Sequence, residues 1–251
     1  MAAINSVTDL TREGDIAVLT VNSPAVNALS ANVRDGLSAG IAQAAADPAV
    51  KAIVLICDGR TFIAGADISE FGKPPKGASL HDVQAAIEGG AKPVIAAIHG
   101  TAFGGGFELA QACHYRIAVP SAQFGQPEIK LGIIPGFGGT QRLPRLVGTS
   151  KALEMNLIGD PILAEEAFEL GLANRVVDDH ELLDTALAWA RRLAAQAPLA
   201  LAQIKRVSGA GDLDEGLAEE KRAFAAAFTS ADAREGIAAF LGKRAPRFTG
   251  N

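Results

Sequence analysis

Apolar runs and segments of helical spacing alternate along the first two thirds of the chain. Short apolar runs around Val7 and over residues 16–21 flank the polar sequence TREG, which predicts a β-hairpin. Ser30 then provides an N-cap for a helix that ends near Asp47. The apolar positions of this helix share one face, and they are Val33, Leu37 and Ile41. The chain therefore starts with a hairpin followed by an amphipathic helix.

Further strands and helices follow with the same alternation. The run AIVLIC (52–57) predicts a buried strand, and GKPPKGAS (72–79) predicts an exposed loop from its proline and glycine content. A helix that starts near Leu80 leads to the strand PVIAAI (93–98), and YRIAV (115–119) predicts another strand. Strands that alternate with helices at this spacing indicate repeated β-α units and an α/β fold.

The pattern changes near Ser150, beyond which the spacing is helical and is interrupted only at NRVVD (174–178). The last segment contains AFAAAF (223–228), which is apolar over more than one amphipathic stripe. We therefore expect this helix to be buried on more than one side. Other apolar residues follow close behind it, namely Ile237, Phe240 and Leu241. So much apolar surface in one helical region favours assembly into a homo-oligomer.

Composition and charge narrow the classes of partner. The 251 residues are 49% hydrophobic and 20% charged, and the formal net charge of −5 argues against nucleic acid or an anionic membrane as the principal partner. The start of the chain lacks the features of a signal peptide, and no apolar run approaches the ~18 residues of a membrane span. The sequence therefore predicts a soluble, cytoplasmic protein.

The cysteines and histidines do not form the patterns of metal or nucleophile sites. Cys57 and Cys113 lie in apolar contexts without a C-x-x-C pair, which predicts reduced thiols in the core. The histidines are scattered without zinc-ligand spacing, and the chain lacks the G-x-S-x-G sequence of many serine hydrolases. We therefore expect neither a metal nor a redox cofactor.

A run of three glycines followed by a glutamate stands where an apolar strand turns into a helix, in HGTAFGGGFELAQACH (99–114). Glycine-rich turns of this kind often bind phosphate, but Leu109 occupies the position of the third glycine of G-x-G-x-x-G, and Glu108 would repel an anion. The arrangement suits a neutral ligand that becomes negative only during reaction. Backbone N–H groups would then stabilise the developing charge while the carboxylate transfers a proton.

Two loops and two glutamates form the candidate site. FIAGADI (62–68) and AFGGGFE (102–108) each place small residues after a buried strand, where backbone N–H groups can approach a ligand closely. Glu108 and Glu128 both have apolar neighbours in the sequence. A carboxyl in apolar surroundings has a raised pKa, which suits acid/base chemistry.

Four segments of the chain carry a resemblance to a known family. These segments are FIAGADISEF, KPVIAAIHGTAFGGGFELA, AQFGQPEIKLGIIPGFGGTQRL and KRAPRF. In order and spacing they resemble the hydratase pattern of the crotonase (enoyl-CoA hydratase/isomerase) superfamily. The resemblance implies an α/β fold with a ββα spiral core at residues 1–195. It also implies a C-terminal helical trimerisation region at residues 196–251, with assembly as a homotrimer or as a homohexamer made from two trimers.

The resemblance also assigns roles to residues of this chain. The N–H groups of Ala66 and Gly105 correspond to the oxyanion hole that holds the thioester oxygen of an acyl-CoA. Glu108 and Glu128 correspond to the two glutamates that add water across the 2-trans double bond of an enoyl-CoA, giving 3-hydroxyacyl-CoA. Coenzyme A is then part of the substrate, and no separate cofactor is implied. The substrate and CoA contacts fall on Ala25, Val26, Ala28, Ile63, Ala64, Gly65, Ala66, Asp67, Ile68, Gly105, Pro127 and Phe137.

The chain departs from the family pattern at several positions. Ala25 and Ser69 stand where many stand-alone hydratases carry lysine, so the groups that meet the CoA phosphates differ from that pattern. Phe137 replaces a smaller residue that is often found in PGxGGT, which alters the expected acyl pocket. The sequence CHYRIA (113–118) resembles the hydratase part of bifunctional β-oxidation proteins. The loop 73–77 and the helix after it are our candidates for the variable wall of the acyl pocket.

Three alternatives to an enoyl-CoA hydratase remain open from the sequence. A Δ3,Δ2-enoyl-CoA isomerase would need only Glu128 to move a proton. A non-catalytic relative would keep the fold and bind acyl-CoA or RNA, which the glutamate pair and the negative charge argue against. A phosphate-binding nucleotide protein is the least favoured of the three, because its glycine motifs are incomplete.

Overall fold

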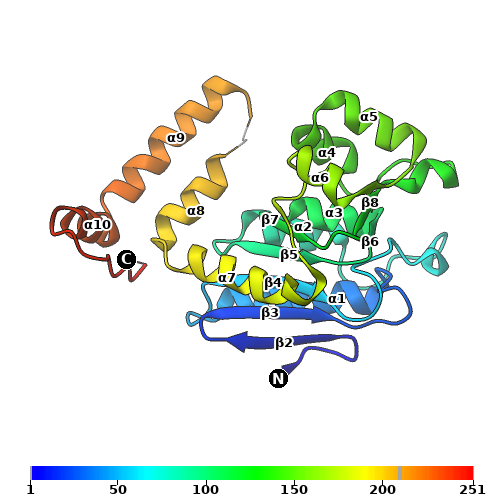
Figure 1. Ribbon diagram of the computed structural model, residues 1–251, viewed down its shortest axis with the longest axis horizontal. Helices are drawn as coiled ribbons and strands as arrows, with labels where there is room; N and C mark the ends of the chain where they lie inside the picture. Colours follow the sequence, from blue (N-terminus) through cyan, green and yellow to red (C-terminus); the bar gives the residue numbers. More distant parts are fainter. Residues whose placement is uncertain (1, 209–210, 251) are drawn as a thin grey trace.

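The structure is a computed structural model that describes residues 2–208 and 211–250, and Figure 1 shows how its elements are arranged. Within the described residues the main sheet has the order β1-β2-β3-β4-β5-β7-β10. Its strands are β1 (Ala2–Ala3), β2 (Thr8–Glu13), β3 (Ile16–Val21), β4 (Ala52–Cys57), β5 (Val94–Ile98), β7 (Tyr115–Ala118) and β10 (Arg175–Val176). A smaller sheet contains β6 (Thr101–Phe103), β8 (Gln123–Gly125) and β9 (Ile162–Leu163).

The helices of the core connect these strands and cover them. They are α1 (Ala31–Ala46), α2 (Leu80–Gly89), α3 (Gly105–Ala112), α4 (Gly139–Val147), α5 (Thr149–Ile158), α6 (Ala164–Glu169) and α7 (Leu182–Ala194). Short 3-10 helices lie at η1 (Ile68–Glu70), η2 (Pro127–Leu131) and η3 (Asp179–Glu181). The C-terminal helices are α8 (Pro198–Val207), α9 (Leu213–Phe228) and α10 (Ala231–Leu241).

The strand pairing confirms the predicted α/β core and a hairpin, but the first strand of the hairpin is Thr8–Glu13 and includes most of TREG, which was predicted as the connection. β2 and β3 are antiparallel, with Glu13 opposite Ile16, whereas β3, β4, β5, β7 and β10 run parallel to one another. Consecutive residues of β4 and β5 are buried, so both faces of the parallel part of the sheet are covered. This arrangement places the carboxyl end of β5, and the turn into α3, at the edge where the predicted site lies.

The predicted first helix is confirmed in its start, end and buried face. Ser30 Oγ accepts a hydrogen bond from Val33 N at 3.4 Å, and Asp47 is the C-cap. The residues of α1 that face the sheet include Val33, Leu37 and Ile41, and all three are buried. The local sequence therefore contains the capping and periodicity signals that determine this element.

The structure corrects two expectations from the apolar pattern. The strand β9 (Ile162–Leu163) adds a second interruption to the helical part, besides the one at NRVVD (174–178). The helix that carries AFAAAF is not buried on more than one side within this chain, since Phe224 and Phe228 are 64% and 58% exposed. The strand β9 was missed because a strand of two residues is too short to show a period. The burial of α9 was overestimated because one chain alone does not supply enough surface to cover this helix.

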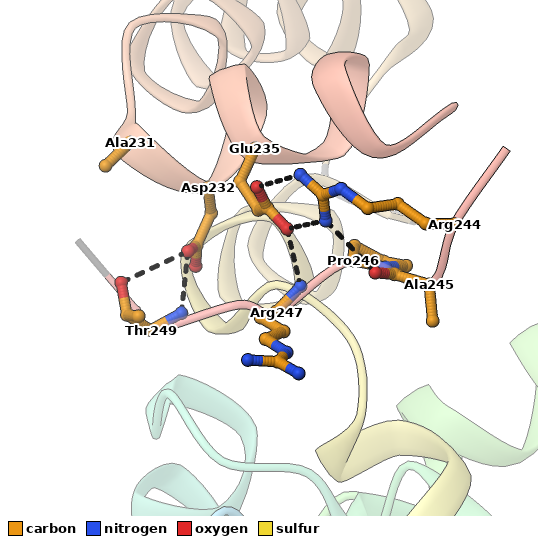
Figure 2. Close-up of a pocket in the computed structure, with 8 residues that line it drawn as sticks. All are labelled: Ala231, Asp232, Glu235, Arg244, Ala245, Pro246, Arg247 and Thr249. Atoms are coloured by element: carbon orange, nitrogen blue, oxygen red, sulfur yellow. Dashed lines mark hydrogen bonds and ion pairs between the residues drawn. The ribbon is translucent and has the colours of Figure 1, made fainter. Parts of the chain in front are cut away.

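The C-terminal helices project from the core in Figure 1, and the tail after α10 folds back along them. Figure 2 shows the contacts that hold this tail. Asp232 accepts hydrogen bonds from the N–H groups of Thr249 and Gly250 at 2.7 and 2.8 Å. Glu235 accepts from the Arg244 guanidinium and from Arg247 N. These two carboxylates line a hollow at this end of the molecule (Figure 2). Because they already bind the tail, the hollow has a structural role.

Candidate active site

A cavity of about 200 Å³ lies where the turn into α3 meets the 62–68 loop, η2 and the 131–137 segment. Backbone and apolar atoms form most of its wall. Its lining residues are Ala64, Gly65, Ala66, Ile68, Phe71, Gly104, Gly105, Glu108, Pro127, Glu128, Leu131, Ile133, Ile134, Gly136 and Phe137. The two glutamates that the sequence singled out therefore share one cavity.

The three consecutive glycines allow the close packing that this cavity needs. Gly104 has φ +49°, and a Cβ atom there would lie 2.8 Å from Glu128 Oε1. A Cβ atom on Gly106 would lie 2.3 Å from the backbone oxygen of Ile63, which cannot move without breaking its bond from Phe103 N. A larger residue at Gly106 would separate α3 from the 62–68 loop, and the positive φ of Gly104 favours glycine there, so the local structure requires glycine at these two positions.

Several backbone N–H groups at the cavity have no hydrogen-bond acceptor within the part of the chain that the structure describes, and those of Ala66 and Gly105 are among them. Gly105 is the first residue of α3, where the N–H groups have no intrahelical acceptor. The loop that carries Ala66 is held in place because Leu29 N donates to Gly65 O at 2.9 Å. Both N–H groups therefore belong to fixed backbone beside the two glutamates.

Glu108 is buried in α3, with 1% of its surface exposed. Its Oε1 accepts hydrogen bonds from Phe137 N and Gly139 N, each at 2.8 Å, whereas its Oε2 has no partner among the described residues. Burial raises the pKa of Glu108, although the two backbone N–H groups, Arg142 and His81 act in the opposite direction. The carboxyl is thus fixed through one oxygen, while the other oxygen is buried without a hydrogen-bond partner.

Glu128 lies at the first turn of η2 and is partly buried. Burial raises its pKa to about 7, and the negative charge of Glu108 adds to that increase. We assign the Gln126 amide so that its nitrogen faces the Glu128 carboxylate, because this orientation lets the nitrogen donate to that carboxylate at 3.2 and 3.3 Å and the oxygen accept from Gln111 Nε2 at 3.3 Å. A carboxyl with a pKa near neutrality can give up a proton and take it back at ordinary pH.

The turn 137–139 supplies the donors to Glu108 and is itself fixed by Arg142. Gly138 has φ +104°, and a Cβ atom there would lie 1.9 Å from Arg142 Nη1, so the turn requires glycine. Arg142 Nη1 donates to Phe137 O at 2.8 Å. The same guanidinium makes two hydrogen bonds to Glu88, at 2.6 and 2.7 Å. The arginine thus holds the turn against α2.

A second hollow of about 370 Å³ adjoins the cavity, and Ala66, Phe71 and Phe137 line both spaces. The loop 73–79 forms its outer wall. Arg34 holds this loop in place by donating to Lys76 O at 2.7 Å and to Ala78 O at 2.8 Å. An elongated ligand in the first cavity would therefore continue into a space bounded by Phe137 and by this loop.

The structure places most of the predicted binding residues on these two spaces. Ala64, Gly65, Ala66, Ile68, Gly105, Pro127 and Phe137 line the cavity, and Asp67 lines the adjoining hollow. Ile63 is fully buried, so its side chain cannot contact a ligand. The turn that contains Ala25, Val26 and Ala28 lies outside the lining of both spaces and meets the 62–68 loop where Ala64 N donates to Val26 O at 3.2 Å.

Sequence reasoning missed three polar residues that hold the glutamates: Gln84, Gln126 and Arg142. Gln84 and Gln126 are both completely buried. Gln84 belongs to the buried face of α2 together with Leu80, Val83 and Ile87. A polar residue among the apolar positions of an amphipathic helix was the available signal, because such a residue needs a buried hydrogen-bond partner.

Residues 2–208 and 211–250 contain no cluster of three or more His, Cys, Asp or Glu side chains that could hold a metal ion. No helix in these ranges is both long enough and apolar enough to cross a membrane.

An α/β core with two carboxyls and unbonded backbone N–H groups on one cavity is the arrangement that the resemblance to the crotonase class of proteins implied. The chain belongs to the enoyl-CoA hydratase/isomerase family, whose sequence profile matches residues 11–251. It is 46% identical over 246 residues to "Probable enoyl-CoA hydratase" of Bacillus subtilis, covering 94% of this chain and 95% of that protein.

Two further relatives agree with this assignment to the family. The chain is 42% identical over 250 residues to the crotonyl-CoA hydratase of Syntrophomonas wolfei, covering 95% of this chain and 96% of that protein. The solved structure of an enoyl-CoA hydratase from Bacillus anthracis superposes with a TM-score of 0.90 at 34% identity, covering 98% of this chain and all of that one. These similarities extend over both the core and the C-terminal helices.

Proposed function

We propose that the protein is an enoyl-CoA hydratase that adds water across the 2-trans double bond of an enoyl-CoA. The observation that carries this proposal is the pair Glu108 and Glu128 on one cavity, with raised pKa values, beside the unbonded N–H groups of Ala66 and Gly105. Relatives with the same activity in their names support it. The product is a 3-hydroxyacyl-CoA. This hydration is a step of fatty-acid β-oxidation and of related acyl-CoA catabolism.

The N–H groups of Ala66 and Gly105 bind the thioester oxygen in this proposal. That oxygen gains negative charge as the double bond is attacked, so two fixed donors stabilise the transition state more than the substrate. Each donor contributes about 3 kcal/mol, the usual scale for one oxyanion-hole hydrogen bond. The N-terminal end of α3 adds a favourable dipole at the same point.

The two glutamates divide the proton transfers between them. Ionised Glu108 takes a proton from water through Oε2, and the water oxygen forms its bond to C3 of the acyl group. Protonated Glu128 gives its proton to C2 on the same face of the double bond. Glu108 ends protonated and Glu128 ionised, and proton exchange with solvent restores the starting state. Buried Glu108, with two N–H donors on one oxygen, suits the role of base, and Glu128, with a pKa near 7, suits the role of acid.

Substrate binding involves the residues that the family resemblance assigns, apart from the buried side chain of Ile63. The thioester lies at Ala66 and Gly105, and the acyl chain continues past Phe137 into the hollow beside the loop 73–79. The CoA part lies along the 24–29 turn and the 62–69 loop. The reaction moves only protons and water, so no metal or redox cofactor takes part, and dialysis against a chelator should leave hydration unchanged.

We also propose that the C-terminal region, residues 196–251, joins copies of the chain into a homotrimer or homohexamer. Its helices α9 and α10 expose large apolar side chains, of which Phe240 is 83% exposed. Exposed apolar area of this extent on neighbouring helices is typical of an interface. The remainder, residues 1–195, is the catalytic core.

The direct test is a panel of 2-trans-enoyl-CoA substrates, from crotonyl-CoA to long-chain homologues, in which hydration removes the absorbance of the conjugated thioester. We expect the absorbance to fall in the presence of the protein for at least one chain length. No loss with any member of the panel would contradict the proposal. A rise in absorbance with 3-enoyl-CoA substrates alone would favour the isomerase instead.

A further inference from the structure

A completely buried glutamine is bonded to the backbone of the site but does not line the cavity. Gln84 belongs to α2, and its Nε2 donates to two backbone oxygens, Glu108 O and Phe137 O, each at 2.9 Å. Both partners are acceptors, so the nitrogen must be the atom that faces them. The side chain thus bridges two segments that are far apart in the sequence.

Both segments that Gln84 joins belong to the environment of one carboxylate. Glu108 is the buried carboxyl itself, and Phe137 N is one of the two donors to its Oε1. Phe137 O accepts a second hydrogen bond from Arg142, which approaches from α4. Because the same nitrogen atom of Gln84 bonds both carbonyls, it fixes the distance between the backbone of α3 and the 137–139 turn.

We propose that Gln84 is a positioning residue that keeps the 137–139 turn in place, so that Glu108 Oε1 stays bound to two N–H groups and Oε2 stays free for the reacting water. This inference rests on the proposed function for its catalytic consequence. Its structural part, the link from Gln84 to the turn, is independent of which reaction the site performs.

The expected consequence of losing Gln84 follows from the groups that face Glu108. The charged or titratable groups around that carboxyl are Arg142 from α4, His81 from α2 and Glu128 from η2. The N–H groups of the turn favour the ionised form against the effect of burial. A displaced turn would weaken those two bonds, so the pKa of Glu108 would rise and less of the carboxyl would be ionised as base.

The test compares Gln84→Met, which keeps the length of the side chain but removes its donor, with the wild-type protein. We expect kcat for hydration to fall roughly 10- to 100-fold while KM changes by less than about threefold, because the geometry of the base is affected and not the binding of CoA. The acid limb of the kcat/KM profile should move to higher pH. Val83→Ala, a buried change on the same helix away from the bridge, is the control and should lower stability without moving the profile.

Hydrogen–deuterium exchange of the peptide that contains residues 137–139 separates this inference from the proposed function. Gln84→Met should speed exchange at these N–H groups, and Val83→Ala should not. A wild-type protein that hydrates no enoyl-CoA would refute the function, and exchange would still decide the role of Gln84. If Gln84→Met does not fold, Gln84→Asn, which shortens the amide by one methylene, replaces it. Unchanged exchange together with an unchanged pH profile would overturn the proposal.

Discussion

At the scale of single residues, the pKa of Glu128 is raised toward neutrality, which suits proton transfer. The folded chain raises it from 4.5 to about 7, mainly through burial. Between these values the folded state binds more protons than the unfolded state, so the free energy of unfolding falls as pH rises through this window. A group poised for proton transfer therefore lowers stability at neutral and higher pH.

We predict that Glu128→Gln stabilises the folded protein above pH 7 and has little effect near pH 4, where both side chains are neutral. The gain should be on the order of 1 kcal/mol, since solvent screening reduces the effect at a partly exposed carboxyl. Urea unfolding at the two pH values measures it. The exposed Glu165→Gln on α6 is the matched control. An equal gain at both pH values would show that the carboxyl is not responsible.

The residues that react were easier to predict from the sequence than the residues that hold them. Glu108, Ala66 and Gly105 stand in short motifs, and the structure places all three on the predicted cavity. Gln84 and Gln126 act through contacts with segments that fold together only in three dimensions. No local pattern specifies such a contact, although a buried polar position in an apolar helix face gives a hint of one.

At the scale of elements, long periodic segments were predictable and very short strands were not. Strand β3, helix α1 and strand β4 follow their apolar patterns closely, whereas β2 lies further along the chain than the apolar run around Val7 predicted. The small sheet of β6, β8 and β9 was missed, because its strands have two or three residues each and pair with distant parts of the chain. Tertiary packing determines such strands more than local propensity does.

The loop 73–77 is the element that we expect to set chain-length preference. It lines the hollow beyond Phe137 and is exposed on its outer side, so its contacts contribute little to the core. Replacing it with a short Gly-Ser connection should shift the preferred enoyl-CoA chain length, with only a small change in the unfolding midpoint. Kinetics on the substrate panel and thermal unfolding measure the two effects. An unchanged chain-length profile would place specificity elsewhere, with Phe137 as the next candidate.

At the scale of the whole molecule, the exposed apolar side chains of α9 and α10 predict association between copies. Light scattering at micromolar concentration should give the mass of a trimer or hexamer. Phe224→Asp should shift the mass toward the monomer, because a charge would then be buried at the interface. Lys221→Ala, at an exposed polar position of the same helix, should leave it unchanged. A wild-type protein that stays monomeric would contradict the assembly.

The central claim is that two carboxyls share the addition of water, and paired substitutions test it most directly. Hydration must both activate water and protonate C2, whereas isomerisation moves a single proton along the acyl chain. Glu108→Gln and Glu128→Gln should each lower kcat for hydration by at least ~10²-fold, while acyl-CoA binding survives through the N–H groups of Ala66 and Gly105. Any isomerase activity should depend on Glu128 more than on Glu108. Near wild-type hydration by Glu108→Gln, with Glu128→Gln inactive, would contradict the account and favour an isomerase.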